Sequence, residues 1–438
     1  MAADLVISGG RLADSAHGGE RVDVVVEDGR ISAVVPVGEA PQARRTLDAS
    51  DAWVMPGFVD IQVHFRTPGG TDSEDIASGA AGAAMGGVTA CVMMPNTNPP
   101  IDTPGMVQDV LAMATGAPCD VRTSAAITVG RAGERLTDFA ALYDTGVRVF
   151  TDDGDCVADD ALMEAALAAT VSLPGAVVSQ HAEDPEMVAG GVINAGAVAE
   201  RMGVQGRPAL AEISVVQRDI GLARGTGGRY HVLHLSTAEA MEQVAQAKRE
   251  GFAVSAEVTP QHLVLTEDDV ERLGTTGKMN PPLRLRSDVE ALRRAIVDGT
   301  LDAVATDHAP HHASLKDTSL RDAAPGMTGV ETMASVIWSE LVATGAMSPA
   351  RFVEVVSAAP ARIAGIAEHG HRVDVGRPAN LAVFDPAQRW TVRADELQSR
   401  SRNTPWAGRE LTGKVRHTVL AGRPVVSGGE LCGSAARG

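Results

Sequence analysis

The chain has few lysines and few cysteines. Its 438 residues include 38 Lys and Arg against 56 Asp and Glu, which gives a formal net charge of −18. Nucleic acids and anionic membranes are bound by clustered basic residues, so this balance argues against both kinds of partner. The cysteines show no CxxC spacing, which indicates neither a zinc knuckle nor a disulfide framework. They are Cys91, Cys119, Cys156 and Cys432.

The N-terminal stretch MAADLVISGG lacks the basic region and the long apolar region of a secretory signal, which predicts a cytoplasmic protein. One uncharged run of membrane length is present, Ile76 to Met94, but it is rich in Ala and Gly and is interrupted at Gly86-Gly87. We interpret it as a helix packed closely on a sheet and followed by a buried strand, rather than as a transmembrane helix.

Short apolar runs alternate with Ala-rich helical patterns through residues 56–367. Runs such as VTACVMMP and YHVLHLST are separated by patterns such as ALMEAALAATV and AEAMEQVAQAKREG. This repetition predicts an α/β fold, namely a TIM-type (β/α)8 barrel, with a doubly wound open sheet as the alternative. Residues 1–55 and 368–438 consist of short strands and turns, and we expect them to pair into one small discontinuous β-sandwich domain.

Nearly every apolar run of the middle region ends in a residue that can bind a metal or move a proton. In a barrel the carboxyl ends of the strands converge on one site, so residues far apart in sequence can hold one ion. Buried charges are costly unless they are paired or metal-bound, which argues against so many being incidental. With imidazole and carboxylate donors and no thiolate, zinc is the expected metal, with manganese or cobalt as substitutes in vitro. The residues are Asp60, Gln62, His64, Asp153, His181, His234 and Asp307.

Long motifs make the chain resemble the bacterial-type dihydroorotases of the amidohydrolase superfamily over nearly its whole length. These enzymes interconvert N-carbamoyl-L-aspartate and L-dihydroorotate in the pyrimidine (UMP) pathway. The matching stretches are PGFVDIQVHFRTPGG, MMPNTNP, FTDDG, QHAED, HVLHLST, AEVTPQHLVLT, KMNPPLRLRSD, TDHAPHH, GMTGVET and RNTPWAG.

The resemblance implies a centre with two metal positions, called α and β. It assigns Asp153 as the bridging carboxylate, His181 and His234 as β-site ligands, and His64 and Asp307 to the α site. Asp307 is also the catalytic residue implied to carry the proton, with a metal-bound hydroxide as the nucleophile. A carboxylated lysine bridge is not expected, because none of the four lysines lies at a strand end near residue 153.

The same resemblance assigns substrate contacts. Arg66 and His311 are implied to hold the substrate carboxylate, with Asn96 beside them, and a guanidinium offers a planar fork suited to this task. Asn280, Pro325 and Gly326 are implied to contact the pyrimidine ring. The polar segment 312–324 is either a lid over the site or an ordinary solvated loop.

The chain departs from the family pattern at three positions. Gln62 stands where the family has the first histidine of its HxH pair, Gln261 replaces the first histidine of PHHL, and Thr67 replaces a glutamate. An amide oxygen is a poor zinc donor beside an imidazole, so we expect one tightly held zinc in the β site and a weak or empty α site. Changes at Thr67 and Gln261 are expected to alter the hydrogen bonds that support the ligands.

These observations favour a zinc-dependent dihydroorotase, and two alternatives stay open. One is an inactive homologue that serves as a scaffold for aspartate carbamoyltransferase, and the other is a related cyclic amidohydrolase such as a hydantoinase. The pair Arg66 and His311 argues against the hydantoinase. Besides the small-molecule substrate, the expected partners are a second copy of the chain and aspartate carbamoyltransferase.

Overall fold

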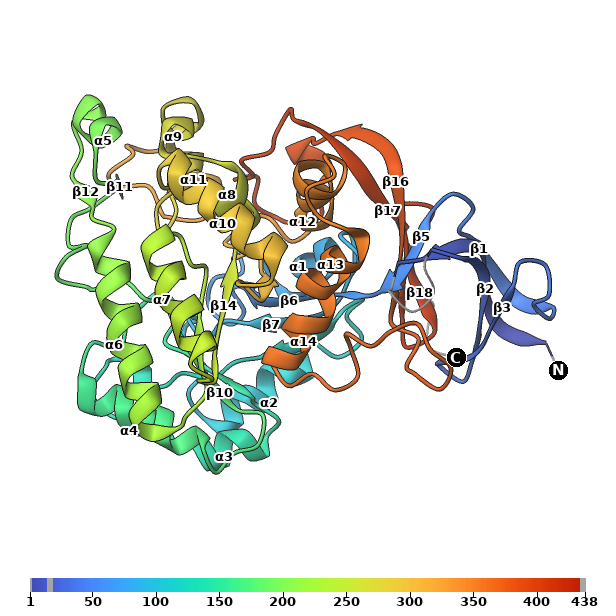
Figure 1. Ribbon diagram of the computed structural model, residues 1–438, viewed down its shortest axis with the longest axis horizontal. Coiled ribbons are helices and arrows are strands. Elements are labelled where there is room, and N and C mark those ends of the chain that lie inside the picture. The colour runs from blue at the N-terminus through green and yellow to red at the C-terminus, as the bar shows by residue number, and fades with distance from the viewer. Residues whose placement is uncertain (1, 14–18, 434–438) are drawn as a thin grey trace.

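Eight parallel strands form the centre of the larger part of the molecule. The computed structural model describes residues 2–13 and 19–433, and Figure 1 shows these strands with helices around them. The strands are β6 (Phe58–Val63), β7 (Val88–Met93), β8 (Asp120–Thr123), β9 (Val149–Phe150), β10 (Val177–Gln180), β13 (Tyr230–Val232), β14 (Val254–Val258) and β15 (Ala303–Val304).

The pairing of these strands runs around a ring. Strands β6, β7 and β8 pair in that order, and so do β9, β10, β13, β14 and β15. A parallel bridge between Ala125 and Phe150 joins the two groups, and a second one between Val63 and His308 connects the end of β15 back to β6. All eight carboxyl ends therefore meet at one end of the ring.

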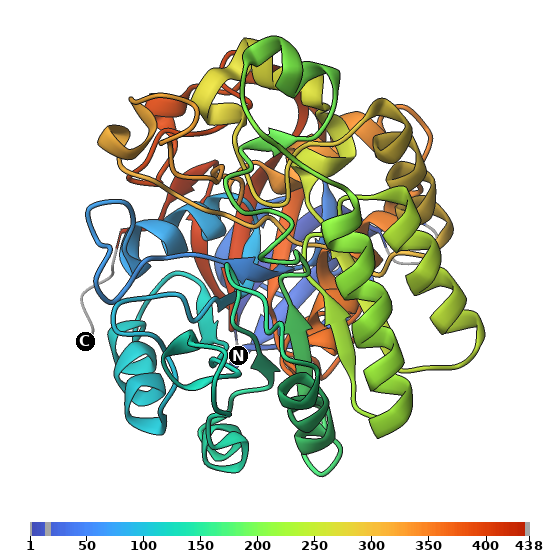
Figure 2. The ribbon, with the colours of Figure 1, turned by 90° about the vertical axis from the view of Figure 1, so that its left-hand side faces the viewer.

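Helices surround the strands, as Figure 2 shows from the end of the molecule that holds the ring. The helices of the ring are α1 (Ile76–Met85), α2 (Pro104–Met113), α3 (Phe139–Asp144), α4 (Asp160–Thr170), α6 (Leu210–Thr226), α7 (Ala238–Arg249), α10 (Arg286–Asp298), α12 (Met333–Ile337), α13 (Pro349–Val353) and α14 (Ala359–Ile363). Shorter elements decorate the loops: η1 (Val129–Arg131), β11 (Ile193–Asn194), α5 (Ala197–Met202), β12 (Gly206–Arg207), α8 (Pro260–Val264), α9 (Glu267–Leu273), η2 (Gly274–Gly277), α11 (Ala313–Lys316), η3 (Trp338–Val342) and η4 (Glu354–Ala358).

The uncharged run 76–94 forms helix α1 followed by strand β7, which confirms the helix-and-strand interpretation. Asp75 caps the helix, accepting a hydrogen bond from the backbone N–H of Ser78. A Cβ atom at Gly79 would lie 2.3 Å from the ring of Phe65, so a glycine is needed for the helix to pack this closely. Among the described residues, no helix is both long enough and apolar enough to cross a membrane.

Both ends of the chain contribute to one nine-stranded sheet beside the ring. Strand β5 pairs antiparallel with β16, with Val54 opposite Val383. The sheet has the order β19-β18-β17-β16-β5-β1-β2-β3, and β4 pairs with β1. Its strands are β1 (Ala3–Leu12), β2 (Arg21–Glu27), β3 (Arg30–Pro36), β4 (Ala43–Asp48), β5 (Trp53–Pro56), β16 (Leu381–Thr391), β17 (Glu410–Leu420), β18 (Arg423–Ser427) and β19 (Glu430–Leu431); η5 (Ala394–Glu396) lies between β16 and β17.

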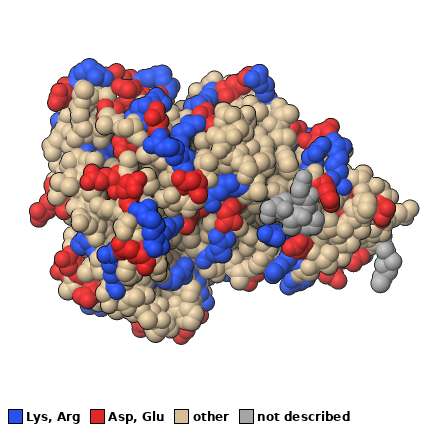
Figure 3. Space-filling model, viewed as in Figure 1, with Lys and Arg blue, Asp and Glu red and all other residues tan. Residues whose placement is uncertain are grey.

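Aromatic side chains join this sheet to the ring. Trp338 packs edge-on against Phe352, with ring centroids 5.4 Å apart, and lies 5.0 Å from Phe384 of β16. Phe352 in turn contacts Phe58 of β6 at 5.6 Å. These buried rings connect a central strand, the outer helices and the terminal sheet. On the face drawn in Figure 3, acidic and basic side chains are interspersed rather than gathered by sign.

Candidate metal centre

The predicted metal ligands lie together at the carboxyl ends of the ring strands. Although they are spread widely in the sequence, the parallel arrangement brings them to one end of the molecule. His64 directly follows β6, Asp153 lies shortly after β9, His181 directly follows β10, His234 lies just after β13, and Asp307 lies just after β15.

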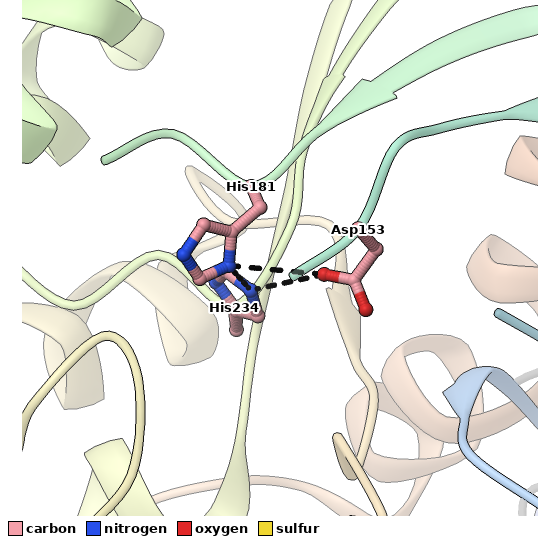
Figure 4. Close-up of side chains that lie close together, drawn as sticks. All are labelled: Asp153, His181 and His234. Atoms are coloured by element: carbon pink, nitrogen blue, oxygen red, sulfur yellow. Dashed lines mark hydrogen bonds and ion pairs between the residues drawn. The ribbon is translucent and has the colours of Figure 1, made fainter. Parts of the chain in front are cut away.

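Asp153, His181 and His234 form a compact buried cluster. Nδ1 of His181 lies 2.9 Å from Nε2 of His234, and Oδ1 of Asp153 lies 3.6 Å from His234 Nε2 and 3.8 Å from His181 Nδ1. Figure 4 shows the two imidazoles and the carboxylate pointing toward one another. Donor atoms about 2 Å from a zinc ion are roughly 3–3.5 Å apart, so this spacing suits one ion held by three side chains.

A second group of ligands faces the other oxygen of Asp153. Nε2 of His64 lies 3.2 Å from Asp153 Oδ2 and 2.9 Å from Asp307 Oδ1. The carboxylate of Asp153 therefore has one oxygen toward His181 and His234 and the other toward His64. This orientation is what a carboxylate shared by two metal positions requires.

Gln62 points into the same site as His64, as the two-residue repeat of a strand predicts. Its Nε2 donates a 3.3 Å hydrogen bond to Oδ1 of Asp153. Its Oε1 is buried and has no hydrogen-bond partner in the part of the chain that the structure describes. An unpartnered buried oxygen is costly, so this atom is available to a metal ion or to a water molecule. The donor set and this oxygen thus fit the metal that the sequence predicts.

Charge coupling within the cluster changes the proton affinity of its members. Burial by itself would raise the pKa of Asp153, but the hydrogen bond with His234 and the charges of His64 and His234 hold it well below its usual range. Burial lowers the pKa of His234, whereas its contacts with Asp153 and Asp307 outweigh this and raise it to about 9. A cation is therefore favoured between these groups, and a proton and a metal ion compete for this place.

Two supporting residues were not identified from the sequence. Glu183, in the quoted stretch QHAED, accepts a 3.2 Å hydrogen bond from Nε2 of His181. It also forms a 2.8 Å ion pair with Arg207. Burial would raise the pKa of Glu183, but these two partners lower it to about 2. Arg131 donates to the backbone carbonyl of Asp153 at 2.9 Å. The acidic residue two positions after His181 was the available signal for Glu183, since metal-binding imidazoles are commonly oriented by a carboxylate.

Asp60 is buried but does not join the ligands. It accepts hydrogen bonds from the backbone N–H and the hydroxyl of Thr306, just after β15. Burial raises the pKa of Asp60 to about 7. This side chain fastens β6 to the end of β15 and so closes the ring beneath the site.

Four of the predicted substrate contacts lie together beside the metal ligands. The Nε of Arg66 donates to the carbonyl of Pro310 at 3.3 Å, and Nε2 of His311 donates to the carbonyl of Pro325 at 2.7 Å. A Cβ atom at Gly326 would lie 2.9 Å from Nε2 of His311, so only a glycine allows this approach. Burial lowers the pKa of Arg66 to about 10, which leaves the guanidinium charged at neutral pH.

The two predicted asparagine contacts differ in their surroundings. The Oδ1 of Asn96 lies 2.9 Å from Nδ1 of His64, which places Asn96 next to the ligands. Asn280 makes no hydrogen bond to another predicted site residue among those described, and its buried Oδ1 is without a partner. The backbone near it is tied to the site, since the carbonyl of Lys278 accepts from the N–H of Gly326 at 2.8 Å.

Segment 312–324 lies next to these contacts and contains the short helix α11. Its lysine, Lys316, is buried, and its Nζ donates to the carbonyls of Thr275 at 2.9 Å and Ala324 at 2.7 Å. Burial and the charge of Lys278 lower the pKa of Lys316 to about 7. Lys316 and Ala323 are the buried residues of this segment, and most of its other side chains are exposed.

Three site residues have left-handed backbone conformations. The φ angles are 51° at Arg66, 31° at His234 and 46° at Asp307. Such conformations cost of order 1–3 kcal/mol for residues other than glycine and persist where the surrounding structure fixes them. The strain lies at a cation-binding cluster and at an adjacent guanidinium, which is consistent with a functional role for both.

The structure is similar over nearly its whole length to that of a solved cyclic amide hydrolase. L-hydantoinase (dihydropyrimidinase) from Arthrobacter aurescens matches with a TM-score of 0.89 and 27% identity, covering 98% of this chain and 97% of that chain. The ring of strands and the cluster at its carboxyl ends define the class of metal-dependent amidohydrolases. A family model described as Dihydro-orotase-like matches residues 52–240.

Curated relatives narrow this class to one family. Dihydroorotase of Anaeromyxobacter dehalogenans (strain 2CP-C) is 45% identical over 431 residues, which are 97% of this chain and 98% of the relative. Dihydroorotase of Streptomyces coelicolor is 43% identical over 418 residues, covering 94% of this chain and 97% of the relative. The chain belongs to the dihydroorotase family.

Proposed function

We propose that the protein is a zinc-dependent dihydroorotase that interconverts N-carbamoyl-L-aspartate and L-dihydroorotate in de novo pyrimidine biosynthesis. The observation that carries this proposal is one strand-end site that combines the cluster of Asp153, His181 and His234 with the half-buried side chain of Arg66. The first group suits a metal ion, and the second suits the carboxylate that distinguishes dihydroorotate from uncharged cyclic amides.

Asp153, His181 and His234 would hold one zinc ion, which corresponds to the β site. His64, Asp153 and Asp307 would hold a second ion weakly, because Gln62 offers an amide oxygen where the family offers an imidazole. When bound, zinc lowers the pKa of a coordinated water to about 7 and polarises the carbonyl of the cyclic amide.

In the hydrolytic direction, water adds to the ring amide carbonyl and the bond between this carbon and the ring nitrogen breaks. We assign Asp307 to take one proton from the water and to return it to the departing nitrogen, which forms the carbamoyl group of carbamoyl-aspartate. The new carboxyl group then ionises and releases the second proton of the water to solvent. Its carboxylate lies 2.9 Å from His64 at the strand ends, within the same site as the proposed ligands. Cyclisation is the reverse of these steps.

Arg66 and His311 are proposed to hold the substrate carboxylate, with Asn96 beside them. Burial and the charges of Arg66 and Lys316 lower the pKa of His311 to about 3, so the unbound imidazole is neutral. A carboxylate bound against its ring would favour the protonated form and add a charge-assisted contact. Asn280, Pro325 and Gly326 are proposed to contact the ring of the substrate.

The domain division is also a proposal. Residues 56–367 would form a TIM-type barrel, and residues 1–55 and 368–438 one β-sandwich domain beside it. The closed order of parallel strands and the pairing of β5 with β16 support this division. A homodimer, an association with aspartate carbamoyltransferase and a cytoplasmic location remain predictions from the family resemblance and the sequence.

Metal analysis of the purified protein, combined with an assay of carbamoyl-aspartate cyclisation, tests the proposed function. We expect bound zinc and measurable cyclisation, with dihydrouracil and hydantoin as poor substrates because they lack the carboxylate. A folded, zinc-loaded protein without cyclisation activity would support the scaffold alternative. Faster turnover of hydantoin or dihydrouracil than of dihydroorotate would assign the protein to another cyclic amide substrate.

A further inference from the structure

A segment from the C-terminal part of the chain reaches the substrate side of the site. We call residues 398–404 the strap; it follows η5 and precedes β17. The strap is fastened to the loop after β6, since the N–H of Arg400 donates to Glu74 at 3.1 Å and the hydroxyl of Ser401 donates to the carbonyl of Ser73 at 2.6 Å. Glu74 also contacts His308 at 3.3 Å. The strap therefore lies across the loops that carry Arg66 and His311.

The side-chain amide of Asn403 makes hydrogen bonds to these loops through both its oxygen and its nitrogen. Its Oδ1 accepts from the backbone N–H of His311 at 3.2 Å, and its Nδ2 donates to the carbonyls of Ala309 and Gly326, both at 3.0 Å. Its own carbonyl accepts from the N–H of Thr328 at 3.1 Å. The side chain is 6% exposed, so these bonds are shielded from competing water.

The three bonds fix the relative position of two substrate-binding elements. Residues 309–311 follow β15, and Gly326 belongs to a separate turn that comes after segment 312–324. The imidazole of His311 touches the carbonyl of Pro325, so a small shift between the two elements would move the imidazole. An amide is suited to this place because it supplies both an acceptor and two donors from one planar group.

We propose that Asn403 is a positioning residue that holds His311 and Gly326 in the arrangement that binds the substrate carboxylate and ring. This inference rests on the proposed function, because it assumes that His311 and Gly326 meet dihydroorotate or carbamoyl-aspartate. Asn403 does not touch the metal ligands in any contact of the described residues. Its loss should therefore weaken substrate binding more than it slows turnover.

The test compares Asn403→Ala and Asn403→Asp with the unmodified protein. The aspartate keeps an acceptor for the N–H of His311 but turns an oxygen toward the carbonyls of Ala309 and Gly326. We expect KM for dihydroorotate to rise roughly tenfold or more in both variants, with kcat within about threefold and zinc content unchanged. Amide exchange of the peptide that contains His311 should become faster in the alanine variant and change less in the aspartate variant.

Thr404→Val is the matched control, because Thr404 is a buried neighbour in the same strap, and among the described residues its hydroxyl accepts only from the N–H of Trp406. It should leave KM unchanged. An unchanged KM in folded Asn403→Ala would overturn the proposal, and so would an equal change in the control. If the unmodified protein lacks cyclisation activity, the proposed function fails, and unchanged amide exchange of residues 309–326 in Asn403→Ala would then overturn the positioning role separately.

Discussion

At the scale of single residues, Gln62 decides how the site differs from its family. Its side-chain N–H donates to the carboxylate of Asp153, while its Oε1 has no partner among the described residues. In the proposed β site, two imidazoles and a carboxylate would hold a zinc ion, a donor set typical of catalytic zinc. The α side keeps one imidazole. Unequal occupancy of the two positions is therefore expected from the donors alone.

Replacing Gln62 with histidine should raise the zinc content from about one toward about two ions per chain, because an imidazole binds zinc better than an amide oxygen does. Cyclisation activity should increase with it. Elemental analysis after gel filtration measures the first effect and a cyclisation assay the second. Gln388→His, which places an imidazole at an exposed position of β16, should leave the zinc content unchanged. Two fully occupied metal positions in the unmodified protein would contradict this account.

Arg66→Ala should lower kcat/KM for dihydroorotate by roughly 10- to 150-fold, which corresponds to about 1.5–3 kcal/mol for a hydrogen bond to a charged group. The slow turnover of dihydrouracil should change much less, since this substrate has no carboxylate. Steady-state kinetics with both substrates provide the measurement. Arg389→Ala is the control, because the side chain of Arg389 on β16 is 71% exposed. An equal loss of kcat/KM for the two substrates would show that Arg66 does not bind the substrate carboxylate.

At the scale of elements, segment 312–324 is neither a free loop nor a packed one. Its polar residues face outward, and its position depends on the buried ammonium of Lys316, which is bonded to three backbone carbonyls. Other bonds also hold the segment, since the N–H of His312 donates to the hydroxyl of Ser73 at 2.9 Å and Nζ of Lys278 donates to the carbonyl of Arg321 at 2.7 Å. The segment is thus held at a few points while most of its side chains stay exposed. This arrangement is compatible with a lid, which is one of the two interpretations of the segment from the sequence.

Lys316→Met should release this segment, because the methionine fills similar space but cannot donate to the carbonyls. We expect faster amide exchange across residues 312–324 and a free energy of unfolding lower by about 1–3 kcal/mol, the usual cost of leaving buried acceptors unpaired. Exchange in helix α7, which packs against β14, should not change. Unaltered exchange in 312–324 would mean that other contacts hold the segment.

The same residue predicts a pH dependence. The pKa of Lys316 is about 7 in the folded protein against 10.5 for an exposed lysine, so between these values the unfolded chain binds more protons. The free energy of unfolding contributed by this group therefore rises with pH across that window. Denaturant unfolding at about pH 6.5 and about pH 9 should show the unmodified protein gaining stability relative to Lys316→Met. A constant difference between the two proteins would exclude a lowered pKa.

At the scale of the whole molecule, the two chain ends share one hydrophobic cluster. Val54 of β5 and Val383 of β16 face each other across the antiparallel pair, and both are fully buried. The N-terminal segment thus depends for its packing on residues more than three hundred positions away. We expect the two ends to fold as one unit.

A double-mutant cycle tests this dependence. Val54→Ala and Val383→Ala should each lower the free energy of unfolding by about 1–3 kcal/mol, and together by an amount that differs from the sum by about 0.5 kcal/mol or more. Val254→Ala on β14 lies in a different cluster and should be additive with Val383→Ala. Additive effects for Val54 and Val383 would indicate two independently packed terminal modules.

The sequence by itself predicted the candidate ligands and the strand end at which each of them lies. Apolar runs that end in His181, His234 or Asp307 are local patterns, and the two-residue repeat of a strand already places Gln62 and His64 on one face. Likewise, the Ala-rich run 76–94 could be read as a helix and a strand, because its glycine pair and its β-branched residues are local signals.

Only the tertiary structure decided which distant groups complete the site. The two oxygens of Asp153 face different ligands because of how β9 lies among its neighbours, and no local pattern encodes that angle. Lys316 lies in a polar stretch, yet it is buried against carbonyls from other loops. Asn403 was visible only as part of a family motif, and its three bonds depend on a strap that crosses from the C-terminal region. Hydrogen bonds between segments depend on distance and direction in space, and these are fixed only when the whole chain has packed.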